Sequence, residues 1–334
     1  MTEKKNENIK NKRKKELFDL NKVRMNIQTQ LEILIPTYNR KPHITRTLTQ
    51  LTAPESPVRL CSITVLDNAS TDGSSDVIAD FAQKFPNIKH LRHAKNIGGN
   101  ANITRAYELA TKPYVWVVCD DDSFRWEAWP EIETALATGS YDLLLTRKDD
   151  LKGTSDIARI FRQCTFVPAG IYRTGLITAS VLIKMYNNIP NMFPHLALIS
   201  EVLNRQGTIF LPQGEIMDVC TFDTKTSGDE WTARGAQQKD YIPPITAQMF
   251  WTVGFLKSVQ LVQDKKLRAY ILDHVGRHGF FGYVWGAFRK NYTHYHGSQF
   301  NVQSVRCTLD GFYRLQFDLA CLLLRVVTLF GRRR

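Results

Sequence analysis

The chain has 334 residues, of which 43% are hydrophobic and 23% are charged, as in an ordinary globular protein. This length allows one large domain or two modest ones with a sizeable core. The formal net charge is +12, which indicates an acidic partner: a nucleic acid, an anionic membrane or a phosphorylated substrate. Much of the positive charge lies in residues 1–24 and 332–334, so the ends of the chain, rather than a predicted core, account for it.

Two further features limit where the protein works. No apolar stretch reaches the roughly 18 residues that a membrane-spanning helix needs, and the start of the chain lacks the apolar segment of a signal peptide. The six cysteines are scattered without a Cys-x-x-Cys pair, which favours reduced thiols over disulfides or a zinc site. We therefore expect a cytoplasmic protein without a structural metal.

After a basic, polar extension at residues 1–30, strands and helices alternate regularly. Apolar runs predict strands at 31–35, 63–66, 88–91, 114–119 and 142–146. Helical patterns separate them at 44–51, 74–85, 100–110 and 126–137. This alternation indicates βαβ units and an α/β fold with a mostly parallel sheet.

The alternation weakens after Arg147, and the rest of the chain is mainly helical in pattern. Helices are predicted at 197–205, 245–262, 268–288 and 309–330. The three beyond residue 241 should pack as a helical appendage. The stretch 319–330, which is apolar and followed by three arginines, fits either a helix lying on an anionic membrane or a helix docked on the domain.

Polar loops follow the first three predicted strands. The first reads Ile-Pro-Thr-Tyr-Asn-Arg and ends at Arg40, where proline and asparagine favour a sharp turn. The second, from Asp67 to Ser74, offers short polar side chains that can cap a helix or bind the hydroxyl groups of a ligand. The third, Lys95 to Asn100, places two glycines before a helix, where free N–H groups can meet an anion.

The fourth strand ends on three consecutive carboxylates, Asp120, Asp121 and Asp122. Ligands of parallel sheets bind where strands end, and neighbouring carboxylates repel one another unless a cation neutralises them. Hard oxygen ligands suit Mg²⁺ or Mn²⁺ bridging the phosphates of a substrate. A solvated acidic turn is the alternative.

The order of these four loops resembles that of the family-2 glycosyltransferases of GT-A fold. The resemblance is close over residues 31–122, looser to about residue 212, and absent beyond. It implies a GT-A domain at 31–225, with a nucleotide-sugar half at 31–146 and an acceptor half at 147–225. A helical region at 241–334, which the resemblance does not cover, would follow, and the membrane-peripheral and docked alternatives both stay open for it.

The resemblance also implies roles for individual residues. Pro36, Thr37 and Tyr38 would line the nucleoside edge, and Asp67 would recognise the base. Asp120 and Asp122 would hold Mn²⁺ or Mg²⁺ on the diphosphate, with Asp120 also near the ribose; such an ion stabilises charge on the leaving nucleotide. The full set of implied donor-binding residues is Pro36, Thr37, Tyr38, Arg40, Asp67, Asn68, Asn96, Gly98, Asp120 and Asp121.

The chain departs from the family where a catalytic base is expected. Family members carry an acidic residue at the start of a helix that precedes a glycine and a strand, whereas this chain has Phe193-Pro194-His195-Leu196 before Gly207. His195 could deprotonate the acceptor, since imidazole titrates near neutrality; a helix-start histidine with local hydrogen bonds is the alternative. Glu201 and Asp218 are weaker candidates. This stretch is also similar to O-antigen dideoxyhexose transferases of the abequosyltransferase-like group.

The resemblance thus implies an inverting, metal-dependent transferase, with His195 and Asp122 as the predicted catalytic residues. Its donor would be a nucleoside diphosphate sugar, and its acceptor a lipid-linked or surface-polysaccharide intermediate at the inner face of the plasma membrane. Two alternatives are a nucleic-acid binder, suggested by charge alone, and a sugar-phosphate nucleotidyltransferase. The concentration of charge at the chain ends argues against the first, and the lack of a glycine-rich basic loop after the first strand argues against the second.

Overall fold

The structure is a computed structural model that describes residues 27–147, 156–190, 192–218, 247–275, 279–289, 306–307 and 309–331. Most of the predicted N-terminal extension lies outside these residues. The chain divides into two compact units. The first comprises residues 1–148, 170–175 and 208–219, and the second comprises 149–169, 176–207 and 220–334.

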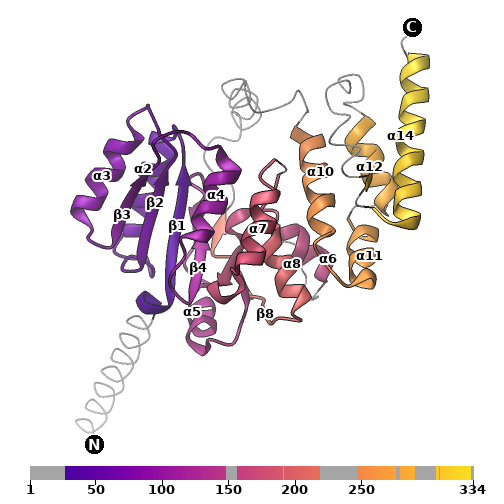
Figure 1. Cartoon of the computed structure of the whole chain (residues 1–334). Coiled ribbons are helices and arrows are strands. Elements are labelled where there is room, and N and C mark those ends of the chain that lie inside the picture. Colours follow the sequence, from indigo (N-terminus) through magenta and orange to yellow (C-terminus); the bar gives the residue numbers. More distant parts are fainter. Residues whose placement is uncertain are drawn as a thin grey trace, which may run out of the picture. The chain divides into compact units, whose positions relative to one another are not determined.

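The first unit is built on a seven-stranded sheet with strand order β3-β2-β1-β4-β7-β6-β8 (Figure 1). The strands are β1 (Leu31–Thr37), β2 (Ser62–Asp67), β3 (Ile88–Arg92), β4 (Tyr114–Val117), β6 (Leu143–Leu145), β7 (Gly170–Arg173) and β8 (Ile209–Phe210). Strands β1 to β4 are parallel to one another, whereas β7 runs antiparallel to its neighbours β4 and β6. The prediction of an α/β fold with a mostly parallel sheet is confirmed.

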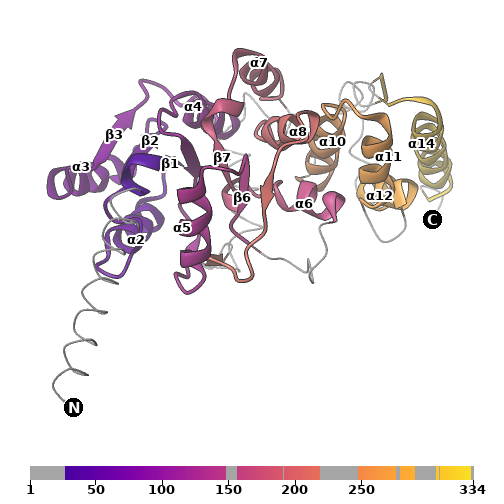
Figure 2. The same ribbon diagram turned by 90° about the horizontal axis from the view of Figure 1, so that it is seen from below.

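Apolar side chains explain why β1 and β4 occupy the middle of the sheet. All four residues of β4 are buried, and so are the five residues from Leu31 to Ile35 of β1. A strand that is apolar throughout suits a sheet covered on both faces. Helices α2 (Lys41–Thr52) and α3 (Ser74–Lys84) cover one face of the sheet, and α4 (Gly99–Glu108) covers the other (Figure 2). These crossovers leave the carboxyl ends of β1, β2 and β4 at one edge.

Some elements of the first unit were not predicted. A two-stranded sheet joins β5 (Ser123–Phe124) to β9 (Met217–Asp218), and β7 and β8 are short strands from a region that the sequence left as loop. Helix α5 (Trp129–Thr138), by contrast, was predicted. The missed strands have two to four residues and are stabilised by pairing with distant segments, so they leave little local pattern.

The second unit is helical in the part that the structure describes. It contains α6 (Ile157–Gln163), α7 (Ala179–Asn187), α8 (Leu196–Asn204), α10 (Ala247–Val259), α11 (Lys265–Asp273), α12 (Gly279–Arg289) and α14 (Gly311–Gly331). Helix α10 packs against α8, α11 and α12, and α12 packs against α14. The predicted helices 245–262 and 309–330 match α10 and α14, whereas 268–288 is divided between α11 and α12. None of the described helices meets the length and apolarity that crossing a membrane requires.

Candidate functional site

Loops from four strands are joined by hydrogen bonds at the carboxyl edge of the sheet. The amide of Asn68 donates to the carbonyl of Thr37 at 2.9 Å, which links the loops after β1 and β2. Asn68 Nδ2 donates to Asn96 Oδ1 at 2.7 Å, which links the loops after β2 and β3. Thr37 Oγ1 donates to Asp120 Oδ2 at 2.6 Å. This bond links the first loop to the turn formed by Asp120, Asp121 and Asp122, called the carboxylate turn below. The structure therefore brings together the loops that the sequence predicted to converge.

Asp67 ends β2 and is fully buried. Its carboxylate accepts the amide of Ser70 at 2.9 Å and the hydroxyl of Ser75, and Arg92 Nε lies 3.4 Å away. Burial alone would raise the pKa of Asp67, but His90, whose Nε2 lies 3.7 Å from Asp67 Oδ2, and hydrogen bonds from Ser70 and Ser75 outweigh it and hold the pKa well below its usual range. Asp67 is therefore a fixed anion that does not supply a proton.

The carboxylate turn after β4 has an internal cation. The Arg40 side chain is 6% exposed; its Nε lies 3.2 Å from Asp120 Oδ1, and its Nη2 donates to Asp121 Oδ2 at 2.6 Å. Burial raises the pKa of Asp120 to about 6, although Arg40 and a hydrogen bond from Thr37 act in the opposite direction. One guanidinium thus bridges two of the three acids, so Arg40 belongs structurally to the carboxylate turn.

Helix α2 holds the backbone of the same turn through residues that the sequence reasoning missed. Arg46 Nη2 donates to the carbonyls of Asp121 at 2.9 Å and Asp122 at 3.2 Å, and Thr47 Oγ1 donates to the carbonyl of Asp120 at 3.0 Å. One turn further along the helix, Gln50 Oε1 accepts a hydrogen bond from the amide of Phe124 at 3.1 Å. Polar residues at positions 46, 47 and 50, beside the buried Leu48 and Leu51, were the signal that could have identified these residues.

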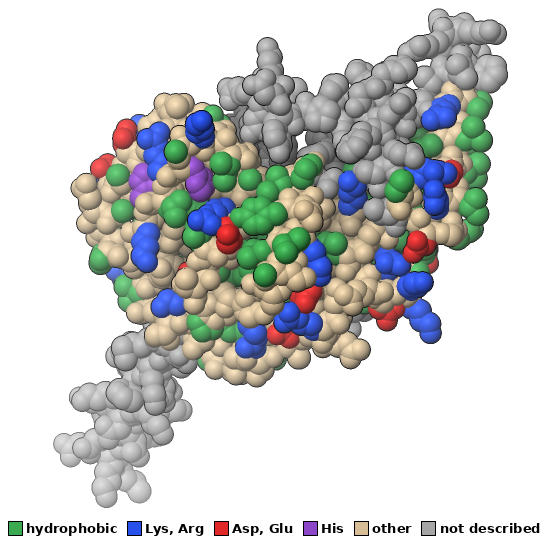
Figure 3. Space-filling view, in the orientation of Figure 1, with side chains coloured by type: hydrophobic (Ala, Val, Ile, Leu, Met, Phe, Trp, Pro, Cys, Tyr) green, Lys and Arg blue, Asp and Glu red, His purple; other side chains and the backbone are tan. Residues whose placement is uncertain are grey.

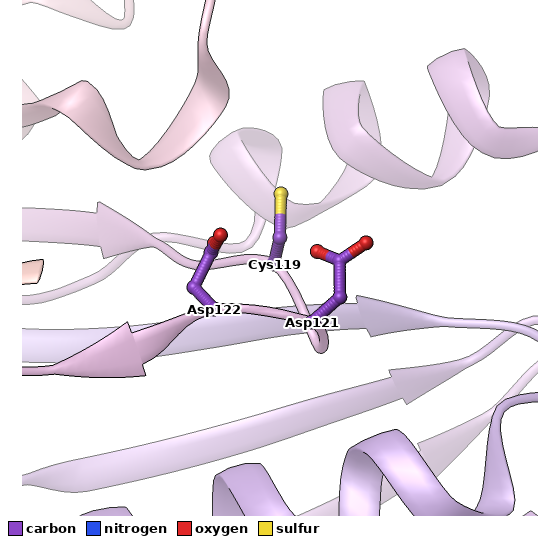
Figure 4. A group of neighbouring side chains, drawn as sticks. All are labelled: Cys119, Asp121 and Asp122. Carbon is purple, nitrogen blue, oxygen red and sulfur yellow. The ribbon is translucent and has the colours of Figure 1, made fainter. Parts of the chain in front are cut away.

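A group of three side chains in this turn could hold a metal ion. Ligand atoms of Cys119, Asp121 and Asp122 all lie within 4.8 Å of one another, and Figure 4 shows the side chains rising from one turn. Asp122 is fully buried, whereas Cys119 and Asp121 are partly exposed. The structure therefore groups Asp121, rather than the predicted Asp120, with Asp122. Two carboxylates fit a hard ion such as Mg²⁺ or Mn²⁺, whereas a thiol suits softer metals.

The glycine loop after β3 has an open approach. Gly98 adopts φ +88°, a conformation that L side chains rarely take, and precedes the first residue of α4. A side chain at Gly98 or Gly99 would meet nothing within 4 Å, so the backbone faces open space. Asn96 Oδ1 accepts the amide of Gly98 at 2.8 Å, which fixes the turn. The loop thus combines exposed backbone with a helix start, as anion-binding loops do.

The three candidate bases have different surroundings. His195 lies in the second unit, is 2% exposed, and its Nε2 lies 3.0 Å from the carbonyl of Cys164 and 3.2 Å from that of Thr165. Because carbonyls only accept, Nε2 carries the proton, and burial lowers the pKa of His195 to about 4. These are properties of a helix-start histidine that fixes a neighbouring loop. Glu201, also in the second unit, pairs with Lys184 at 3.3 Å and Arg205 at 2.8 Å.

Asp218 lies in the first unit, on the small sheet beside the carboxylate turn. Its strand β9 pairs with β5, where Asp218 stands opposite Ser123, the residue that follows Asp122. Arg125 Nε donates to Asp218 Oδ2 at 2.5 Å, and the Asp218 side chain is 30% exposed. Of the three candidates, Asp218 is the one that belongs to the same unit as the carboxylates.

Comparison with known proteins shows which family the chain belongs to. The model of glycosyl transferase family 2 matches residues 32–204. The chain belongs to this family. It is 30% identical to abequosyltransferase RfbV of Salmonella typhimurium over 121 residues. This matched segment covers 36% of each chain. It is 24% identical over 162 residues to the poly(ribitol-phosphate) β-N-acetylglucosaminyltransferase TarS of Staphylococcus aureus, over 44% of this chain and 28% of TarS.

Among solved structures, the fold is similar to that of S. aureus TarS residues 1–349 in complex with UDP-GlcNAc. The TM-score is 0.56 at 15% identity, over 90% of this family-2 chain and 92% of that chain. At this identity the likeness concerns the fold, and it confirms the predicted GT-A architecture. The matches to the curated relatives RfbV and TarS span about a third of their length.

Proposed function

We propose that this family-2 protein transfers a sugar from a nucleoside diphosphate sugar to a hydroxyl group of a glycan acceptor. The observation that carries the proposal is that Asp67, the glycine loop and the carboxylate turn lie at one edge of the sheet. Hydrogen bonds of Thr37 and Asn68 connect the loops that carry them. The solved TarS complex with UDP-GlcNAc, a nucleotide sugar, has a similar fold. Family membership argues against the two alternatives of a nucleic-acid binder and a nucleotidyltransferase.

The nucleoside would lie against the loops after β1 and β2. Pro36, Thr37 and Tyr38 would line its edge, and Asp67 would accept a hydrogen bond from an N–H group of the base. The low pKa of Asp67 supports this role because the carboxylate remains an acceptor at all physiological pH values. Donor residues further along the edge would be Asn68, Asn96 and Gly98.

The diphosphate would lie over the carboxylate turn. Asp121 and Asp122 would hold Mg²⁺ or Mn²⁺, whose remaining ligands would be phosphate oxygens and water. When bound, the ion would neutralise charge on the leaving nucleotide. Asp120 would bind the ribose, because it accepts a hydrogen bond from Thr37 and does not belong to the group of Asp121 and Asp122. Arg40, which pairs with both Asp120 and Asp121, would keep the two carboxylates in position.

Transfer with inversion requires a base that takes the proton from the acceptor hydroxyl as it attacks the anomeric carbon. His195 was the predicted base, and its assignment stays a prediction. Its burial and its two carbonyl partners favour the structural alternative. Asp218 is supported by its position opposite Ser123, immediately after the carboxylates. A carboxylate paired with Arg125 can accept a proton once that ion pair opens.

The acceptor is proposed to be a lipid-linked or surface-polysaccharide intermediate, bound by the part of the chain at 147–225. The names of the relatives support this class, since one is an abequosyltransferase and another acts on poly(ribitol-phosphate). The basic residues at 1–24 and 332–334 would draw the protein to the anionic inner face of the plasma membrane.

A thermal-shift panel of nucleoside diphosphates and their sugars, each with Mn²⁺, Mg²⁺ or chelator, tests the donor site. Stabilisation by one nucleotide that is lost with chelator supports the proposal and identifies the base. No response to any nucleotide would contradict it. Release of pyrophosphate from a nucleoside triphosphate and a sugar phosphate would favour the nucleotidyltransferase, and salt-dependent binding of random oligonucleotides would favour the nucleic-acid binder.

A further inference from the structure

Helix α2 bonds one short segment of backbone in the candidate site. Its Arg46, Thr47 and Gln50 side chains all bond main-chain atoms of residues 120–124. This segment runs from the carboxylate turn into strand β5. On the face of the molecule that Figure 3 shows, the basic and acidic side chains of the described residues are interspersed, so surface charge there does not single out a site.

The carboxamide of Gln50 bonds the backbone on both sides of Ser123. Its Oε1 accepts a hydrogen bond from the amide of Phe124 at 3.1 Å, and its Nε2 donates to the carbonyl of Asp122 at 3.5 Å. A carboxamide has both an acceptor and donors, as a peptide group does. Gln50 therefore bonds this backbone as a neighbouring strand would.

Different parts of the chain hold the two edges of β5. In an antiparallel pair, successive amides point alternately toward the partner strand and away from it. The amide of Arg125 donates to the carbonyl of Ile216 at 2.8 Å, on the side of β9. The amide of Phe124 points to the other side, where it meets Gln50. One side chain of α2 thus closes the edge of β5 that faces away from β9.

Aromatic packing holds the side chain of Phe124 separately from its backbone. The Phe124 ring meets Trp116 edge-on, with 5.7 Å between ring centroids, and stacks on Trp126 at 5.2 Å. These contacts do not involve Gln50, so a chain without the Gln50 carboxamide should still fold. What it loses is the hydrogen bond that fixes the backbone of β5 against α2.

We propose that Gln50 is a positioning residue that sets the distance between the carboxylate turn and the candidate base Asp218; this inference rests on the proposed function. Ser123 follows the proposed metal ligand Asp122 and stands opposite Asp218. By bonding on both sides of Ser123, Gln50 fixes the residue that separates the two groups. A misplacement of about 1 Å between reacting groups can cost on the order of a hundredfold in rate.

Gln50 and Arg46 should differ in what they control. Arg46 bonds the carbonyls of Asp121 and Asp122, and its 3.2 Å bond to Asp122 remains when Gln50 is replaced. Gln50→Met removes the bond to Phe124, on the side of the base. We therefore expect nucleotide affinity with Mn²⁺ to change by less than about threefold and turnover to fall by about tenfold or more.

Amide hydrogen exchange of the full chain, resolved by NMR, tests the positioning without a donor. In Gln50→Met the protection of Phe124 should fall by about tenfold, and that of Arg125 by at least about threefold, because β5 is no longer held from α2. The amide of Asn68, which donates to the carbonyl of Thr37, should keep its protection.

Two variants serve as comparisons. Gln50→Glu keeps an acceptor oxygen for the amide of Phe124 and should retain its protection, which identifies this bond as the one that matters. Gln83→Met is the matched control, because it changes an exposed glutamine of α3 in the same way. Its exchange and turnover should equal those of the natural chain.

Turnover is measured as nucleotide release from UDP-GlcNAc and the other nucleotide sugars of the thermal-shift panel, with Mn²⁺ and with water as acceptor. Gln50→Met that turns over as fast as Gln83→Met would overturn the inference. Loss of protection at Phe124 alone, with Arg125 unchanged, would also overturn it, because Gln50 would then bond one amide without positioning β9. A natural chain that binds no nucleotide would instead contradict the proposed function, whereas the exchange measurement would still decide whether Gln50 holds β5.

Discussion

Replacing Arg40 by methionine tests whether the carboxylate turn depends on its internal cation. The substitution keeps much of the apolar length of the side chain but removes both ion pairs, to Asp120 and to Asp121. The Asp120 and Arg40 side chains are 10% and 6% exposed. Removing one partner of such a buried pair costs about 3–5 kcal/mol because the other charge remains buried. We expect a loss of unfolding free energy of this size at pH 8.

The loss should depend on pH in a defined direction. The pKa of Asp120 is raised from 3.8 to about 6, so the folded protein binds this proton more tightly than the unfolded chain. Protonation of Asp120 therefore stabilises the fold as the pH falls from above 6 towards 4, by about 3 kcal/mol. Without Arg40 the pKa of Asp120 rises further, and the deficit of the variant should shrink between pH 8 and pH 5.

Urea unfolding of both proteins at pH 8 and pH 5 measures these differences. Arg105→Met is the matched control, because Arg105 pairs with Glu108 on the surface, where its side chain is 40% exposed. That variant should lose less than about 1 kcal/mol at either pH. If Arg40→Met is no less stable than Arg105→Met, or if its deficit is the same at both pH values, the buried pair does not hold the turn and the reasoning fails.

Three further predictions concern the proposed donor site and base. Asp122→Asn should abolish turnover and chelator-sensitive nucleotide binding. Its melting temperature should not fall below that of the control variant Asp76→Asn, which changes an exposed residue. Retained activity of Asp122→Asn would exclude a role for Asp122 in metal binding. Arg46→Met should weaken nucleotide binding on the order of tenfold in titration calorimetry, because the carbonyls of the turn lose a shared donor, and unchanged affinity would contradict this. His195→Gln can still donate to the two carbonyls, so the fold should survive; a kcat lower by two to four orders of magnitude in a stable variant would identify His195 as the base.

The parallel part of the sheet was predictable from the sequence. The apolar run of β4 is continuous, and those of β1 and β2 are interrupted by single polar residues, Glu32 and Thr64, so the three strands carry most of the signal by themselves. The convergence of the loops followed from the same prediction, because parallel strands end at one edge of a sheet. The positions of Asp67 and Asp122 at that edge therefore needed no knowledge of tertiary contacts.

Pairings between distant segments were not predictable. Strand β7 enters the sheet between β4 and β6 although it follows both in the chain, and β9 reaches β5 from more than ninety residues away. The stability of such short strands comes from their partners, and the sequence of four residues or fewer does not specify a partner. The position of Asp218 beside the carboxylate turn depends on one of these pairings.

The sequence by itself determined where the strands end to within about two residues, because local apolar periodicity and turn residues decide where a strand stops. Only the tertiary structure decided what the residues at those ends contact. It grouped Asp121 with Asp122, placed Arg40 between Asp120 and Asp121, and buried His195 against two carbonyls. Adjacent side chains of a turn point in different directions, and the choice among neighbouring carboxylates is made by partners far away in the chain.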